Sequence, residues 1–172
     1  MKRMAFLREL RRLIPVYGAD NVVYLDETGF RKHAYRPHGW ALRGEKIYGD
    51  ISGCNHKNIN LIMAQRRKQY LAPMLFEGTC DHLLVNAWLA ECLVPLLEKP
   101  SIVIMDNAPF HKKKDIAAIL EKNNHFLLPL PPYSPDFNPI EKTFGTLKKR
   151  RDFAPQGTSI DDILKSSDCY FK

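Results

Sequence analysis

The sequence has 172 residues, 45% of them hydrophobic, which suits one globular domain with a core of its own. No apolar run approaches the roughly 20 residues that span a bilayer, so no membrane association is expected. The four cysteines form no CxxC pair, which favours free thiols and a reducing cytoplasm. The net charge of +7 favours a polyanionic partner, because basic side chains release the counterions condensed on phosphates.

The N-terminal half predicts one amphipathic helix followed by three strands. Phe6, Leu10 and Leu13 recur at helical spacing among charged residues, and Pro15 with Gly18 should end this helix. β-Branched and aromatic runs predict strands at residues 22–25, 59–63 and 70–76. Pro73 in the third run indicates an edge strand or a bulge. We expect these three strands to form a meander.

The C-terminal half alternates helices with strands. Helices are predicted at residues 84–97, 112–122, 139–151 and 160–167, and Thr79 could cap the first of them. Strands are predicted at residues 101–105 and 126–128. Strands that alternate with helices add in parallel through right-handed crossovers. The expected fold class is therefore α/β, a mixed five-stranded sheet with helices on both faces.

Two acids follow apolar strands. Asp26 comes directly after the first strand and Asp106 after the fourth, and in open α/β sheets chemistry gathers just beyond the strand ends. Two carboxylates that meet there repel each other unless a proton or a cation lies between them, and oxygen-rich sites suit Mg²⁺ or Mn²⁺. Taken singly, each residue is better explained as a turn-forming Asp that bonds its own backbone.

A third acid lies at a helix start. Asn138, Pro139 and Glu141 fit the N-cap, N1 and N3 positions, so a capping box explains their spacing. The same geometry places the Glu141 carboxylate on a rigid first turn, where it could be a third metal ligand. The two interpretations are compatible. Glu27 is not counted as a ligand, because adjacent strand residues face opposite sides.

Three segments resemble the catalytic motifs of bacterial insertion-sequence transposases of the Tc/mariner superfamily, namely residues 22–30, 104–111 and 130–141. The second and third acids are separated by 34 residues, the spacing of the DDE branch of that superfamily. The resemblance covers residues 20 to 151 and implies an RNase H-like fold, in agreement with the strand and helix order. It implies a helix and linker at residues 1–20, an RNase H-like DDE catalytic domain at 21–151 and a short tail at 152–172.

By this resemblance Asp26, Asp106 and Glu141 hold two Mg²⁺ or Mn²⁺ ions, with Asp26 bridging both. The expected activity is metal-dependent DNA cleavage followed by strand transfer, in the cytoplasm and associated with the nucleoid. Two alternatives stay open. One is an RNase H-like nuclease that only hydrolyses, and the other is an inactive or truncated remnant that binds DNA or inhibits an intact transposase.

Full transposases of this type carry helix-turn-helix domains ahead of the catalytic core, and residues 1–20 leave no room for one. We therefore expect a split or truncated transposase, whose reader of the DNA ends is a separate polypeptide or has been lost. Synapsis of two DNA ends would need a homodimer.

Basic residues close to the acids in sequence are candidate phosphate contacts: Lys112, Lys148, Lys149, Arg150 and Arg151. The last four equally suit a solvated helix end that complements the helix dipole. His111 could approach the scissile phosphate or could be a polar residue at a helix start. Trp40 could stack on an unpaired base or anchor a loop.

Two C-x-H pairs make a zinc site conceivable. They are Cys54 with His56 and Cys80 with His82. His82 is expected at a helix start, however, and the spacing matches no zinc template.

Overall fold

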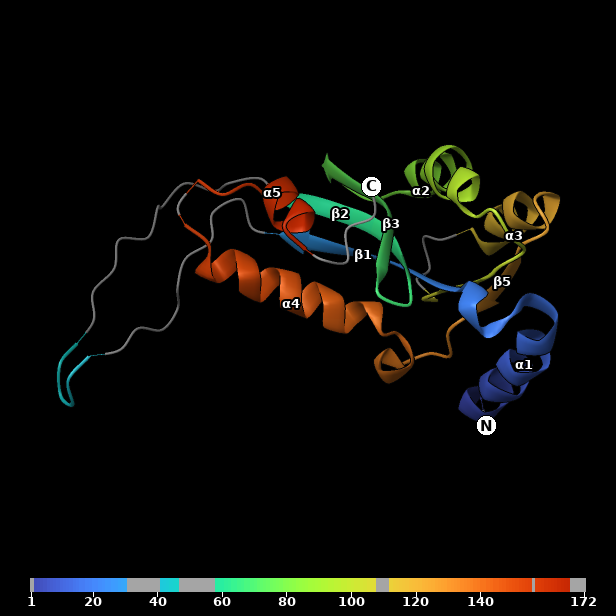
Figure 1. Cartoon of the computed structure of the whole chain (residues 1–172), viewed down its shortest axis with the longest axis horizontal. Coiled ribbons are helices and arrows are strands. Elements are labelled where there is room, and N and C mark those ends of the chain that lie inside the picture. Colours follow the sequence, from blue (N-terminus) through green and yellow to red (C-terminus); the bar gives the residue numbers. More distant parts are fainter. Residues whose placement is uncertain (1, 31–40, 47–57, 108–111, 156, 168–172) are drawn as a thin grey trace.

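The computed structural model describes residues 2–30, 41–46, 58–107, 112–155 and 157–167. Its centre is a five-stranded sheet in the order β3-β2-β1-β4-β5 (Figure 1). The strands are β1 (Val22–Phe30), β2 (Ile59–Arg66), β3 (Gln69–Glu77), β4 (Ile102–Met105) and β5 (Phe126–Pro129). β1, β2 and β3 pair antiparallel, whereas β4 lies parallel between β1 and β5. The predicted meander with added parallel strands is confirmed.

In the described residues, the α-helices that pack on the sheet are α1 (Lys2–Tyr17), α2 (His82–Trp88), α3 (Lys113–Lys122), α4 (Ile140–Phe153) and α5 (Ile160–Lys165). α2 continues into a π-helical stretch, Leu89–Leu93, and a 3-10 turn, Val94–Leu96. Figure 1 shows α4 running along β1 and β2, with α2 and α3 at a distance from it. None of the helices in the described ranges is long and apolar enough to cross a membrane.

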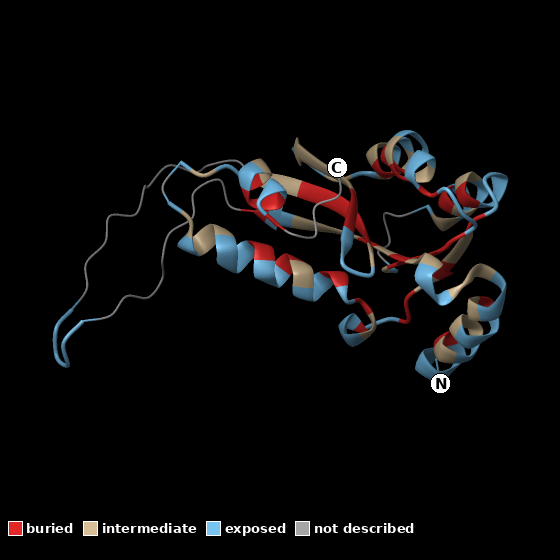
Figure 2. Cartoon of the chain, in the orientation of Figure 1, coloured by how far each residue is buried: buried red, intermediate tan, exposed pale blue. Residues whose placement is uncertain are grey.

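The sheet is buried on both faces because its strand residues alternate between two cores (Figure 2). Val103 and Met105 of β4 pack with α2 and α3, whereas Ile102 and Ile104 pack with α1. Across β2, Leu61 and Met63 face α4 and α5. This period of two fixes the register, because a slip of one residue would exchange the two faces. The two buried faces are covered by helices, so the predicted helices on both faces of the sheet are confirmed.

The predicted end of β1 is wrong, and the predicted end of α1 is confirmed at Gly18 but not at Pro15. β1 does not stop at Asp26 but runs on to Phe30, because β2 pairs with it as far as Phe30. α1 continues through Pro15 to Tyr17. It ends at Gly18, whose positive φ of 88° closes the helix as its N–H donates to the Ile14 carbonyl.

Two further sequence predictions concern the cap of α2 and the position of Pro73 in β3. Asp81, not Thr79, caps α2, since its carboxylate accepts from the Leu84 N–H at 2.8 Å. Pro73 lies in an edge strand beside an irregular register, so that prediction is confirmed. There Ala72 has a positive φ of 48°, and its carbonyl accepts from the buried Trp88 indole at 2.8 Å.

Candidate active site

Asp26 lies within β1 on the face that α4 covers. Val23 and Leu25 belong to the core under α2 and α3, so the alternation of the strand turns Asp26 to the opposite side. α4 packs on β1 at that side. The side chain is half-buried. A carboxylate is therefore held on a rigid strand rather than on a loop.

Both carboxylate oxygens of Asp26 accept a hydrogen bond. Oδ1 accepts from the backbone N–H of Glu27 at 2.9 Å, and Oδ2 accepts from Nδ2 of Asn138 at 2.9 Å. Each oxygen keeps further acceptor capacity, since an ionised carboxylate offers about four lone-pair positions. The two donors fix the plane of the group and leave it able to bind a cation.

Asp26 carries an unusual proton affinity. Burial, together with the charges of Glu27, Asp106 and Glu141, raises its pKa to about 7, although the hydrogen bond from the Glu27 N–H lowers it. The Asp106 and Glu141 carboxylates therefore lie near enough to act on Asp26. A cation bound among these acids would relieve both the burial and the repulsion.

The register of the sheet explains why the first two acids meet. Leu25 of β1 pairs with Met105 of the parallel strand β4. Asp26 and Asp106 are each the next residue along neighbouring strands, and Asp106 is half-buried just past the end of β4. Glu141 comes from the other layer, exposed in the first turn of α4.

The three acids do not form a single closed cage. Within the described ranges, no three His, Cys, Asp or Glu side chains converge on one ion position. Mg²⁺ usually takes one or two protein carboxylates and completes its shell with water and substrate phosphates. Carboxylate oxygens are donors of this kind, so the chemistry of the three side chains suits the predicted Mg²⁺ or Mn²⁺.

The predicted capping box at α4 is wrong. α4 begins at Ile140 with Pro139 before it, and no side chain caps it. The Asn138 side chain, only 2% exposed, instead gives its amide to Asp26. Sequence reasoning missed Asn138 as a site residue, because an Asn three residues before a Glu at a helix start is fully explained by capping.

The basic residues of α4 divide between two sides of the helix. Lys148, Lys149 and Arg150 are exposed, and Lys148 follows Glu141 by two turns on the same side, about 10 Å along the axis. Arg151 is half-buried on the stripe that packs into the core with Phe144 and Leu147. Lys112 is exposed just before α3. Lys148, Lys149 and Arg150 therefore have freer access to a phosphate backbone than the half-buried Arg151.

The remaining sequence candidates fall into two groups. His111, Trp40, Cys54 and His56 lie outside the described residues. His82 is the first residue of α2, as expected. Burial, together with Glu27 and Asp81, raises the pKa of the Cys80 thiol to about 12, which opposes zinc ligation because zinc binds thiolates.

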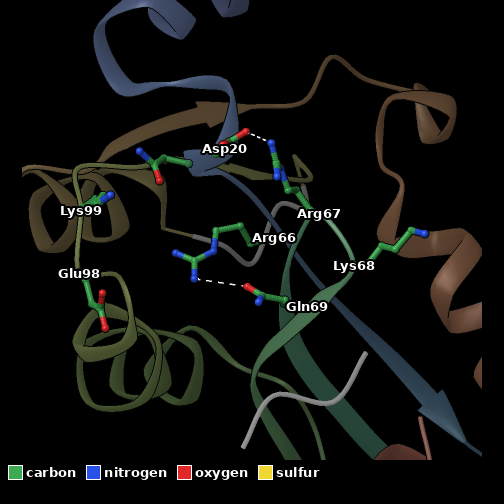
Figure 3. Close-up of a pocket in the computed structure, with 8 residues that line it drawn as sticks. Asp20, Arg66, Arg67, Lys68, Gln69, Glu98 and Lys99 are labelled. Carbon is green, nitrogen blue, oxygen red and sulfur yellow. Dashed lines mark hydrogen bonds and ion pairs between the residues drawn. The ribbon is translucent and has the colours of Figure 1, made fainter. Parts of the chain in front are cut away.

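A polar cavity of about 610 Å³ lies at the other end of the sheet (Figure 3). It is formed by the β2–β3 turn and by the residues that precede β1 and β4, with Arg66, Lys68 and Lys99 in its lining. None of the three acids lines it. The cavity and the acid site are therefore separate features.

Comparisons with known proteins point to one family. The family model described as "DDE superfamily endonuclease" matches residues 21–161. No curated protein sequence matches the chain.

Solved structures share the fold. The Mos1 strand transfer complex aligns with a TM-score of 0.70 at 18% identity over 95% of this chain and 51% of that one. The mariner Mos1 paired end complex with Mg gives 0.68 at 20% identity, covering 90% and 50%. The catalytic domain of Mos1 mariner transposase gives 0.58 at 15% identity, covering 95% and 83%. The chain spans about half the length of the first two.

These likenesses bear out an RNase H-like sheet of the kind found in transposase catalytic domains. The family match covers most of the chain and includes all three acids gathered around β1 and β4. The chain therefore belongs to the DDE superfamily endonuclease family.

Proposed function

We propose that the chain is the catalytic core of a DNA transposase of the Tc/mariner type, with Asp26, Asp106 and Glu141 as its metal ligands. The observation that carries this proposal is the position of Asp26. Its carboxylate, on β1, accepts two hydrogen bonds and interacts electrostatically with the charges of Asp106 and Glu141. The proposed catalytic domain is residues 21–151, with residues 1–20 and 152–172 as flanking segments.

Each acid has a distinct role in this proposal. Asp26 contributes to both ion positions, Asp106 to one and Glu141 to the other. When bound, the two ions would activate the attacking oxygen and neutralise charge on the leaving oxygen. The exposed cations Lys148, Lys149 and Arg150 would bind backbone phosphates and keep a scissile bond near the acids.

The partners follow from the same proposal. The related structures are described as paired end and strand transfer complexes, with Mg or Mn in some. For this chain we propose DNA as substrate, Mg²⁺ or Mn²⁺ as cofactor, a homodimer that pairs two ends, and association with the nucleoid. A separate helix-turn-helix polypeptide would supply recognition of the DNA ends.

Nicking of supercoiled plasmid tests the acid site. The wild type with Mn²⁺ should convert supercoiled to open-circular DNA, and Asp106→Ala should abolish this. Asp115→Ala, which removes an exposed acid from α3, should nick like the wild type. Equal nicking by wild type and Asp106→Ala would contradict the proposed triad.

Strand joining tests the transposase part of the proposal. An oligonucleotide with a free 3′ hydroxyl should become linked to a target plasmid in the presence of Mn²⁺. Nicking without joining would indicate a nuclease that only hydrolyses. DNA binding without either reaction would indicate an inactive subunit.

A further inference from the structure

We propose that Asn138 is a positioning residue, which orients the Asp26 carboxylate for metal binding and ties it to the helix that carries Glu141. The inference rests on the proposed metal-dependent function and deepens it. It concerns a residue that touches neither the DNA nor an ion directly, but acts through Asp26.

The first step is the contact itself. Nδ2 of Asn138 donates to Oδ2 of Asp26 at 2.9 Å, between residues that lie 112 positions apart in the sequence. The Asn138 side chain is 2% exposed, so water cannot readily replace this donor. Together with the Glu27 N–H on Oδ1, the amide leaves the carboxylate one orientation. Loss of either donor would free it to rotate.

The second step is the link to the third acid. The backbone carbonyl of Asn138 accepts from the Glu141 N–H at 3.3 Å, at the start of α4. One residue therefore contacts the first acid through its side chain and the first turn of α4 through its backbone. A shift of the α4 start would move Asn138 relative to Asp26 and weaken the hydrogen bond between them.

The third step is what holds Asn138 itself. The residues just before it are fixed by α1: the Phe137 ring stacks on Phe6 at 5.5 Å, and the Arg3 guanidinium lies 4.5 Å from the centre of that ring. Arg3 also pairs with Asp136. The Asn138 N–H donates to the Pro135 carbonyl at 2.9 Å. Its backbone is thus anchored on both sides, as a positioning residue requires.

The carbonyl oxygen of the Asn138 amide, Oδ1, allows its role in positioning to be tested apart from its role in stability. Oδ1 of Asn138 is buried and has no hydrogen-bond partner among the described residues. A buried carbonyl oxygen without a partner destabilises a fold. Replacing the amide by an apolar group of the same shape removes this unpaired oxygen, which offsets part of the stability lost when Asp26 loses its donor. Removal of such an outer partner typically weakens metal affinity or activity 10–100-fold.

The test compares Asn138→Leu, which keeps the branched shape, with Asn138→Ala, which cannot overfill the site. Asn86→Leu and Asn86→Ala are the matched controls, since Asn86 of α2 also has a buried Oδ1 with no partner among the described residues. Circular dichroism and thermal unfolding check that each variant folds. Mn²⁺ affinity is measured from free Mn²⁺ by electron paramagnetic resonance, without DNA.

We expect both Asn138 variants to bind Mn²⁺ about 10–100-fold more weakly than the wild type, and both Asn86 variants to bind normally. In plasmid nicking, the Mn²⁺ concentration for half-maximal rate should rise, and the rate at saturating Mn²⁺ should largely recover. Wild-type affinity in a folded Asn138 variant would overturn the inference alone. A wild type that binds no Mn²⁺ would overturn the proposed function and this inference together.

Discussion

Asp26 should make the metal-free protein less stable as the pH rises from about 4 to about 7. Burial, reinforced by neighbouring acids, raises the pKa of its carboxyl from an ordinary 3.8 to about 7. Within this window the folded protein keeps a proton that the unfolded chain has released. The free energy of unfolding therefore falls with rising pH and is lowest above pH 7.

The size of the effect follows from the two pKa values. Their difference, at 1.36 kcal/mol per pH unit, corresponds to about 4 kcal/mol above pH 7. Asp26→Asn removes the ionisation but also replaces one acceptor oxygen by an amide, which costs about 1–2 kcal/mol. At pH 8 the variant should be about 2–3 kcal/mol more stable than the wild type, although it lacks the ligand needed for activity.

Urea unfolding in the presence of a chelator measures this directly. The difference between Asp26→Asn and wild type should grow by about 2–3 kcal/mol from pH 5 to pH 8. Burial lowers the pKa of His125, which changes stability in the opposite direction, but both proteins share it and the difference cancels it. Asp106→Asn, which keeps Asp26, should retain most of the wild-type pH dependence.

A stability difference that stays flat between pH 5 and pH 8 would refute the reasoning, because Asp26 would then ionise in its ordinary range. Mg²⁺ provides an independent check at pH 8. Since a bound cation relieves the same burial and repulsion, it should stabilise the wild type and not Asp26→Asn.

Two further outcomes are expected. Replacing the exposed basic residues at 148–150 by Ala should weaken binding to any DNA sequence and reduce the salt slope of log K by about 3, from titrations at several salt concentrations. The matched control removes three charges at the far cavity: Arg66, Lys68 and Lys99. An equal effect of both triple variants would contradict an interface on α4. Trp88→Phe leaves the Ala72 carbonyl without its donor and should cost about 1–3 kcal/mol in urea unfolding, and an unchanged midpoint would contradict this.

Local patterns were sufficient for the order of elements. The continuous apolar run at residues 102–105 reflects burial on both faces of the sheet, and the helical spacing of Ile116 and Leu120 reflects burial on one side of a helix. Both patterns are written in neighbouring residues. Where two neighbouring residues, or two roles of one residue, fit the same local pattern, the pattern did not predict the correct one. Thr79 and Asp81 can each cap a helix, and Pro15 can end a helix or lie near its last turn.

The sequence by itself determined the fold class and was enough to propose the three acids, because strand periodicity and motif spacing are local or near-local properties. Only the tertiary structure decided that the Asn138 amide belongs to Asp26 rather than to the start of α4. It also decided that Arg151 packs inward while Lys148 stays exposed. The physical reason is that the sequence offers the Asn138 side chain a suitable partner nearby, the start of α4, and does not show a partner that is distant in the chain. Packing of α4 on β1 is what brings a distant carboxylate within its reach.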